Sequence, residues 1–299
     1  MSIGLMPLLL VLAASVASSG FDLFRKMLVR DLAPVPMVFL LATASVPLFG
    51  AAVAFGGPVD VQGAYWWPAL GSVALNVVAN LTFLEAVRIS PLSVTVPLLS
   101  LTPVFTALLG FGLLGERLEP LQIAGIVLVV IGAFWLNVGM TAGAAPESGG
   151  ERRSLARSFL SQPGAWMMAG TALLLSLTIP LDKLAVNYAN PPFHGLILTA
   201  GIAFGTLIVL AVQNRWGELA GLRRGWLPFL LALASSTLAL GFQLVALKFV
   251  FVSLIETLKR GIGNLLAVIL GRAVFHEPLT PGKVGAALLM AVGVALILL

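Results

Sequence analysis

Residues 91–114 read PLSVTVPLLSLTPVFTALLGFGLL and contain no charged side chain. An α-helix needs about 20 mostly apolar residues to cross the ~30 Å hydrocarbon core of a bilayer. This stretch is therefore long and apolar enough to span a membrane. Similar stretches lie on both sides of it. Ten candidate spans follow one another along the chain: residues 4–24, 35–55, 66–87, 91–114, 119–138, 163–184, 192–213, 226–247, 250–275 and 281–299.

The composition of the whole chain also predicts an integral membrane protein. Hydrophobic residues make up 59% of the 299 residues and charged residues only 10%, whereas a soluble domain is roughly one quarter charged. A soluble enzyme, a nucleic-acid-binding protein and a disordered protein do not fit these values. The chain has no cysteine and only two histidines, His194 and His276. It therefore predicts no disulfide, no metal site, no cofactor and no catalytic triad.

The connections between the spans predict the organisation of the chain. The one long polar connection, residues 139–162, predicts a basic linker between two units, residues 1–138 and 163–299. Connections after the odd-numbered spans carry twelve Lys and Arg residues, and the opposite side carries three. Because basic loops stay in the cytoplasm, we expect both termini on the non-cytoplasmic side of a multi-pass protein of a bacterial inner membrane.

The two units resemble each other in sequence. Residues that are rare in this chain recur 157 to 161 positions apart: Lys26 with Lys183, Trp66 with Trp226, and Glu116 with Glu277. Five spans per unit is an odd number, so the second unit enters the membrane upside down relative to the first. The predicted fold class is all-α integral membrane, with ten transmembrane helices as two inverted five-helix repeats. Such repeats are typical of secondary transporters, whose substrate site lies between the halves.

Two matching motifs carry a resemblance to a known family. The first half contains Ser90-Pro-Leu-Ser-Val-Thr-Val-Pro-Leu and Leu-Gly-Glu116-Arg-Leu-Glu-Pro120, and the second half contains Ser253 and Phe275-His-Glu277-Pro-Leu-Thr-Pro281. They resemble the EamA repeat of the ten-helix drug/metabolite transporter superfamily, over essentially the whole chain. The resemblance implies a secondary active transporter of a small organic metabolite that works by alternating access, and not an enzyme. It does not specify the substrate.

The span at residues 250–275 carries three ionisable residues, Glu256, Lys259 and Arg260. Lys259 and Arg260 lie about 13–15 Å into the helix, where a charge costs at least ~2.5 kcal/mol on insertion scales. At 100° per residue the three share one face with Asn264, and this face should line the interior. One carboxylate neutralises only one of the two cations. The remaining charge predicts a substrate with an anionic group, and a self-contained ion cluster is the structural alternative.

An amino acid, an organic acid or a phosphorylated metabolite would supply the anionic group. Adjacent Lys259 and Arg260 resemble the sugar-phosphate translocator branch of the superfamily, where such a pair holds phosphate. That branch adds a basic residue on its fourth helix, and this sequence has none between Arg88 and Arg117. Glu256 is either a proton-coupling site or a counter-ion. A lipid or lipid-linked flippase and a cationic drug exporter are the alternative functions on this fold.

Other polar residues complete the predicted site, which spans 3, 4, 8 and 9 enclose. Asn76 and Asn80 share a face of the third span and Gln243 lies on the eighth. They line the cavity or form interhelical hydrogen bonds. Lys26 and Lys183 end the first helix of each half. Snorkelling to the headgroups is the simpler interpretation of this pair, and a gate ion pair that forms on one side at a time is the functional one.

Helix-breaking residues occur at corresponding positions of the two halves. Pro97 and Pro103 lie in the fourth span and Gly261 and Gly263 in the ninth, with Pro103 matching Gly263. Paired interruptions of this kind predict hinges beside a transporter site, although gentle kinks for packing are an alternative. The expected partners are a small-molecule substrate and the lipid bilayer, with a coupling proton or counter-substrate. No nucleic acid is expected, and the protein is a monomer or a homodimer.

Overall fold

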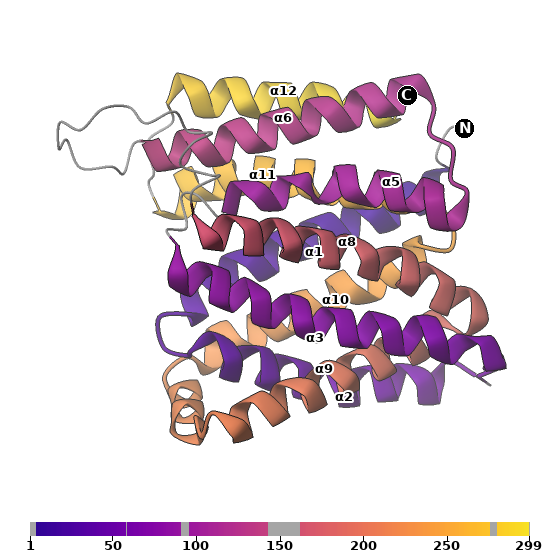
Figure 1. The fold of residues 1–299 in the computed structure, drawn as a ribbon, viewed down its shortest axis with the longest axis vertical. Coiled ribbons are helices and arrows are strands. Elements are labelled where there is room, and N and C mark those ends of the chain that lie inside the picture. The colour runs from indigo at the N-terminus through magenta and orange to yellow at the C-terminus, as the bar shows by residue number, and fades with distance from the viewer. Residues whose placement is uncertain (1–3, 58, 91–95, 143–161, 276–279, 299) are drawn as a thin grey trace.

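The computed structural model describes residues 4–57, 59–90, 96–142, 162–275 and 280–298. Regular structure within these ranges is entirely helical, and the helices lie side by side in one bundle (Figure 1). They are α1 (Leu5–Leu28), α2 (Pro34–Phe55), η1 (Gly63–Tyr65), α3 (Trp66–Ile89), η2 (Val96–Leu101), α5 (Thr102–Leu114), α6 (Pro120–Ala142), α8 (Pro163–Tyr188), α9 (Pro191–Val212), η3 (Trp216–Arg223), α10 (Trp226–Ala246), α11 (Val252–Phe275) and α12 (Pro281–Leu298).

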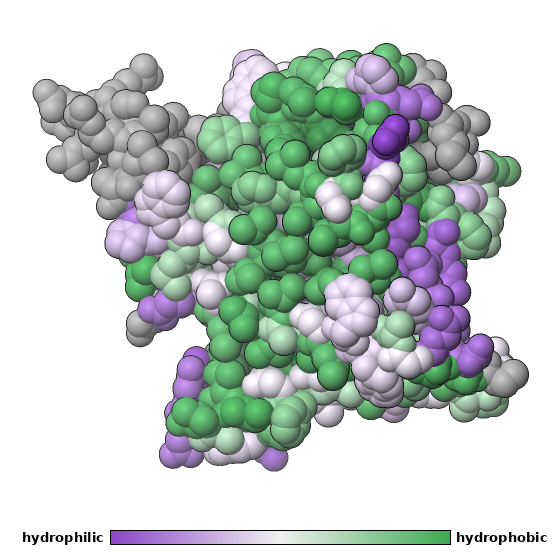
Figure 2. Space-filling view, turned by 45° about the vertical axis from the view of Figure 1, so that its right-hand side comes forward, coloured by the Kyte–Doolittle hydropathy of each residue, from purple (hydrophilic) through white to green (hydrophobic). Residues whose placement is uncertain are grey.

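The length and hydropathy of the helices confirm an integral membrane fold. Figure 2 shows a broad hydrophobic surface over the bundle, with hydrophilic residues gathered toward its margins. Among the described residues, Pro120–Leu136 is a shorter apolar helix. Helices α3 and α11 do not meet the combined limits of length, hydropathy and charge for a membrane-spanning helix. Ten spans therefore remain a prediction. Seven segments are long and apolar enough to cross a membrane: Leu5–Leu28, Pro34–Phe55, Pro97–Leu114, Pro163–Tyr188, Pro191–Val212, Trp226–Ala246 and Pro281–Leu298.

Proline and glycine set many helix boundaries. Helices α2, α6, α8, α9 and α12 each begin at a proline, whose missing N–H would have no partner in the first turn anyway. Gly115 follows α5 with φ of 67°, a left-handed conformation that glycine adopts without steric cost. Helix α6 runs to Ala142, and the rest of the predicted linker up to residue 161 lies outside the described residues.

The fourth predicted span differs from a continuous α-helix. Residues Val96–Leu101 form the 3-10 helix η2, and α5 begins only at Thr102. Pro97 lies in η2 and Pro103 in the first turn of α5. The Thr102 carbonyl at this junction accepts hydrogen bonds from Thr106 Oγ1 at 2.8 Å and Ser176 Oγ at 3.1 Å. The change of helix type thus leaves this carbonyl satisfied.

Helices of the two halves contact each other in a reciprocal pattern. Helix α3 packs against α8 and α10 against α1, while α5 packs against α8 and α11 against α1. In the sequence repeat, α1, α3 and α5 correspond to α8, α10 and α11. Replacing each helix by its counterpart turns the α3–α8 contact into the α10–α1 contact, and the α5–α8 contact into the α11–α1 contact. Gly125 faces Gly293 and Gly132 faces Ala286. The 161-residue offset matches Gly125 with Ala286 and Gly132 with Gly293, so it turns one of these contacts into the other. Both chain ends lie at the same end of the bundle (Figure 1).

Candidate functional site

The first turns of α11 carry one ion cluster, formed by Glu256, Lys259 and Arg260. Glu256 Oε1 lies 3.3 Å from Arg260 Nη2, and Glu256 Oε2 lies 3.6 Å from Lys259 Nζ. The Glu256 side chain is 9% exposed, whereas those of Lys259 and Arg260 are 20% and 29% exposed. The i+3 and i+4 spacing places the three on one face. One buried carboxylate is therefore shared by two cations that keep accessible surface.

Two neighbouring helices add neutral partners to the ion cluster. Lys259 Nζ donates to Gln243 Oε1 of α10 at 2.5 Å, and Arg260 Nη2 donates to Thr102 Oγ1 of α5 at 2.9 Å. The Thr102 hydroxyl in turn donates to Glu256 Oε1 at 3.2 Å. Thr102 belongs to the first half of the chain and the other members to the second. The cluster therefore joins the two halves and carries a net charge of +1 within these contacts.

A second ion pair, between Lys183 and Glu116, lies at the N-terminal end of α11. Lys183 Nζ donates to Glu116 Oε1 and to the Val250 carbonyl, each at 2.8 Å. The Glu116 carboxylate also accepts the Val252 N–H, with distances of 3.2 and 3.0 Å to its two oxygens. A carboxylate at this position favours the helix N-terminus. Glu256 follows Val252 by four residues, about 6 Å along the helix, so the pair adjoins the ion cluster.

A third polar group, missed by the sequence analysis, is buried between α3, α8 and α9. The Ser72 hydroxyl donates to Asp182 Oδ1, which lies 3.1 Å from His194 Nε2, and His194 Nδ1 lies 3.2 Å from the Tyr65 hydroxyl. Asp182 is 3% exposed and the other three are fully buried. Burial and the Asp182 carboxylate raise the pKa of Tyr65. We name these four residues the Asp182 cluster.

The predicted asparagines make contacts that lead away from the ion cluster. Asn76 Nδ2 donates to the Ser72 carbonyl, and Asn80 Nδ2 donates to the Asn76 carbonyl, both within α3. Asn264 Nδ2 lies 3.7 Å from Met290 Sδ of α12. Of the predicted binding residues, the structure thus brings Glu256, Lys259, Arg260 and Gln243 together and places the asparagines elsewhere. The predicted gate residue Lys26 lies in the last turn of α1.

The four predicted hinge residues have different surroundings. Pro97 and Pro103 flank the change from η2 to α5, whereas α11 continues as an α-helix through Gly261 and Gly263. A Cβ at Gly261 would lie 2.7 Å from Val294 Cγ2 of α12, so the missing side chain permits close helix packing. Of these four residues, only the two prolines lie at a change of helix type, and a hinge role of all four remains a prediction.

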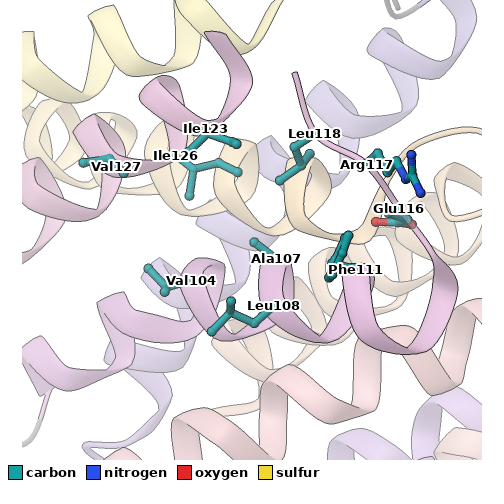
Figure 3. Close-up of a pocket in the computed structure, with 10 residues that line it drawn as sticks. All are labelled: Val104, Ala107, Leu108, Phe111, Glu116, Arg117, Leu118, Ile123, Ile126 and Val127. Carbon is teal, nitrogen blue, oxygen red and sulfur yellow. The ribbon is translucent and has the colours of Figure 1, made fainter. Parts of the chain in front are cut away.

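A lateral groove of about 510 Å³ lies between α5 and α6 (Figure 3). Its polar end is formed by Glu116 and Arg117 in the turn between the two helices. Leu108 and Phe111 are exposed, so the groove opens at the outer surface of the bundle, and it shares Glu116 with the Lys183 ion pair. The apolar lining residues are Val104, Ala107, Leu108, Phe111, Leu118, Ile123, Ile126 and Val127.

Comparison with known proteins supports the predicted family resemblance. Residues 5–138 match the EamA-like transporter family. These residues are similar to an EamA-like transporter, and the match covers just under half of the chain. The resemblance inferred from the Glu116 motif is thereby confirmed. The matched family is one of transporters, and the apolar helices of this chain agree with a protein of that kind.

A curated protein and a solved structure also resemble this chain. Protein LicB of Haemophilus influenzae (strain ATCC 51907 / DSM 11121 / KW20 / Rd) is 27% identical over 104 residues. The match covers 35% of this chain and 36% of LicB, about one third of either length. One solved crystal structure has a TM-score of 0.73 and 19% identity, and the match covers 97% of this chain and 96% of that one. At this identity the likeness shows a shared fold alone.

Proposed function

We propose that the protein is a secondary active transporter that moves a small organic solute with an anionic group by alternating access. The observation that carries this proposal is the imbalance of the ion cluster, two cations against one carboxylate. An anion bound by Lys259 and Arg260 would remove that imbalance. Arginine offers a planar fork of donors and lysine a compact charge, a combination that suits a carboxylate or a phosphate.

An unsatisfied hydroxyl on the same helix face supports a polar site there. Within the described residues, Ser253 Oγ is buried and has no hydrogen-bond partner. Ser253 precedes Arg260 by seven residues, about two helical turns, and so lies on nearly the same face of α11. Leaving a buried hydroxyl unpaired costs about 1–3 kcal/mol. A ligand that extends from Arg260 about 10 Å along this face would give the Ser253 hydroxyl a partner.

The Lys183–Glu116 pair is the proposed gate at the end of the bundle where α11 begins. It ties α8, the α5–α6 turn and the first N–H of α11 together within a few residues of Lys259 and Arg260. Opening the pair would free the turn from α11 and give access to the ion cluster from that end. By the sequence repeat, Lys26 at the end of α1 takes the same part at the opposite end. The basic connections at that opposite end support a cytoplasmic location for it.

Thermal unfolding of the purified protein tests the proposed substrate class. Glutamate, succinate, glucose 6-phosphate and a tetraphenylphosphonium cation are added to the wild type, Lys259→Ala and Arg260→Ala, with the exposed Arg223→Ala as control. A ligand at 100 times its Kd stabilises the folded state by about 2.7 kcal/mol. We expect one of the anions to stabilise the wild type and the control but neither cluster variant. Stabilisation by the cation alone, or anion shifts that persist in both cluster variants, would contradict the proposal.

The lateral groove favours a second candidate function, translocation of a lipid or lipid-linked molecule. Its apolar walls open at the outer surface between α5 and α6 and lead to Glu116, a path that an acyl chain would follow from the bilayer. A fluorescent phospholipid in proteoliposomes, quenched from outside by dithionite, distinguishes the two functions. Protein-dependent lipid translocation without any stabilising soluble anion would favour this second function.

A further inference from the structure

The Asp182 cluster takes no part in the proposed substrate site, and it has the composition of a proton-binding site. We propose that Tyr65, Ser72, Asp182 and His194 bind one proton per transport cycle and that this proton controls the Lys183–Glu116 pair through α8. The control of the gate rests on the proposed function. The binding of the proton does not, because it follows from the cluster alone.

The hydrogen bonds are all satisfied when the carboxylate is ionised and the histidine is neutral, which is the state before the proposed proton arrives. Neutral histidine carries one N–H, and placing it on Nε2 lets His194 donate to Asp182 Oδ1 at 3.1 Å. His194 Nδ1 is then an acceptor, and the Tyr65 hydroxyl donates to it at 3.2 Å. Ser72 donates its hydroxyl proton to the same Asp182 oxygen. Every bond is accounted for with an ionised carboxylate and a neutral ring, so the cluster has a net charge of −1.

The surroundings described by the structure supply no compensating cation. From α3, Asn76 adds a neutral amide that donates to the Ser72 oxygens. From α9, the Phe193 ring packs on the Tyr65 ring with centroids 5.5 Å apart. On α8 itself, Lys183 follows Asp182, but its ammonium donates to Glu116 and the Val250 carbonyl. Among the described residues, the hydrogen-bond partners of the buried Asp182 carboxylate are the Ser72 hydroxyl and the neutral His194 ring.

A single proton would remove this uncompensated charge. Burying an unpaired ion costs several kcal/mol, and ionisable residues within transmembrane segments commonly form proton relays. The arriving proton binds His194 Nδ1, and the Tyr65 oxygen becomes the acceptor of that N–H while its own O–H turns away. The resulting imidazolium and carboxylate have a net charge of zero. No other group changes its protonation in this step.

The position of Asp182 couples the proton to the gate. Asp182 and Lys183 are consecutive on α8 and so point about 100° apart, Asp182 toward α3 and α9 and Lys183 toward the α5–α6 turn and α11. A shift of α8 that carries Lys183 away from Glu116 also moves Asp182 relative to Ser72 and His194. Gate opening therefore changes the affinity for the proton, and by linkage the proton changes the gate equilibrium by the same factor.

The first experiment detects the proton without any substrate. Because the chain has two histidines, His276→Gln leaves His194 as the single imidazole for 15N NMR of histidine-labelled protein in nanodiscs. Over about pH 4 to 10, a range that brackets histidine titration, we expect the two ring nitrogens to change in one step from the Nε2–H tautomer to the imidazolium. The same measurement in the Asp182→Asn variant should give a different pH dependence of the two ring nitrogens. Constant shifts in the His276→Gln protein, or a titration that Asp182→Asn leaves unchanged, would overturn the proposal.

The second experiment follows the gate, again without substrate. The chain has no cysteine, so spin labels can be attached at Arg117→Cys and Asn187→Cys. These are exposed sites on the α5–α6 turn and on α8. Double electron–electron resonance then measures the distance between the two labels. We expect a population of molecules with a longer distance between the labels, and the fraction of molecules in it should differ between high and low pH. The difference should vanish with Asp182→Asn and with His194→Gln, and remain with the exposed Asp22→Asn. A distribution that is the same at both pH values would refute the coupling.

The outcomes separate this inference from the proposed function. Neither experiment uses a ligand, so a failed search for a stabilising anion leaves the titration of His194 as evidence for the proton site. Conversely, an anion bound by Lys259 and Arg260 beside a His194 that never titrates would support the transporter and refute its proton site.

Discussion

The buried Lys183–Glu116 pair yields the sharpest quantitative prediction. Lys183→Met removes the ammonium but keeps a flexible apolar side chain. The Glu116 side chain, which is 5% exposed, then keeps the Val252 N–H as its remaining described donor. Removing one partner of a buried ion pair costs about 3–5 kcal/mol. Lys183 is 16% exposed and the backbone N–H remains, so we expect the lower end, about 3 kcal/mol of unfolding free energy.

Unfolding by SDS in mixed micelles measures this cost, and a double-mutant cycle isolates the pair. Adding Glu116→Gln to Lys183→Met removes the stranded charge, so we expect a coupling energy of about 2 kcal/mol. The matched control is Arg25→Met, in the Asp22–Arg25 pair whose side chains are 63% and 45% exposed, and it should cost less than about 1 kcal/mol. If Lys183→Met costs no more than this control, the pair does not hold α8 to α11, and the gate argument fails.

Two further substitutions test the ion cluster and the helix packing. Glu256→Gln removes the carboxylate that competes with the anion for both cations. The stabilising anion should therefore bind about tenfold more tightly, equal to about 1.4 kcal/mol of binding free energy. An unchanged Kd by titration calorimetry would mean that the anion does not bind these cations. Gly201→Ala places a Cβ 2.5 Å from Val73 Cγ1, so α9 and α3 must separate at a cost of about 1–3 kcal/mol. Gly50→Ala meets nothing within 4 Å and should be neutral or stabilising in the same SDS titration; equal effects of the two would refute the packing argument.

The sequence predicted the ion cluster because its geometry is local. Glu256, Lys259 and Arg260 lie within five residues, and helical periodicity alone decides that they share a face. The contribution of Thr102 was not predicted, since its contacts with α11 join residues 154 and 158 positions apart. Such pairings depend on how helices pack, which one sequence does not encode in any periodic pattern.

Lys183 shows how packing decides between two interpretations of one residue. Snorkelling was the simpler expectation for a lysine near a helix end, yet its ammonium binds Glu116, which is 67 positions away in the sequence. The Asp182 cluster also forms only through helix packing. Its hydrogen bonds join residues up to 129 positions apart, and His194 had no partner nearby in the sequence. The one available signal was an aspartate inside an apolar span.

Exchange transport in proteoliposomes tests the central claim most directly. Vesicles loaded with the anion that stabilises the protein are diluted into the same radiolabelled anion, and counterflow is followed for the wild type, Lys259→Ala and Arg260→Ala. The account predicts saturable counterflow in the wild type and its loss in both variants, with the Arg223→Ala control unaffected. Counterflow that continues at the wild-type rate in both cluster variants would show that Lys259 and Arg260 do not bind the transported solute.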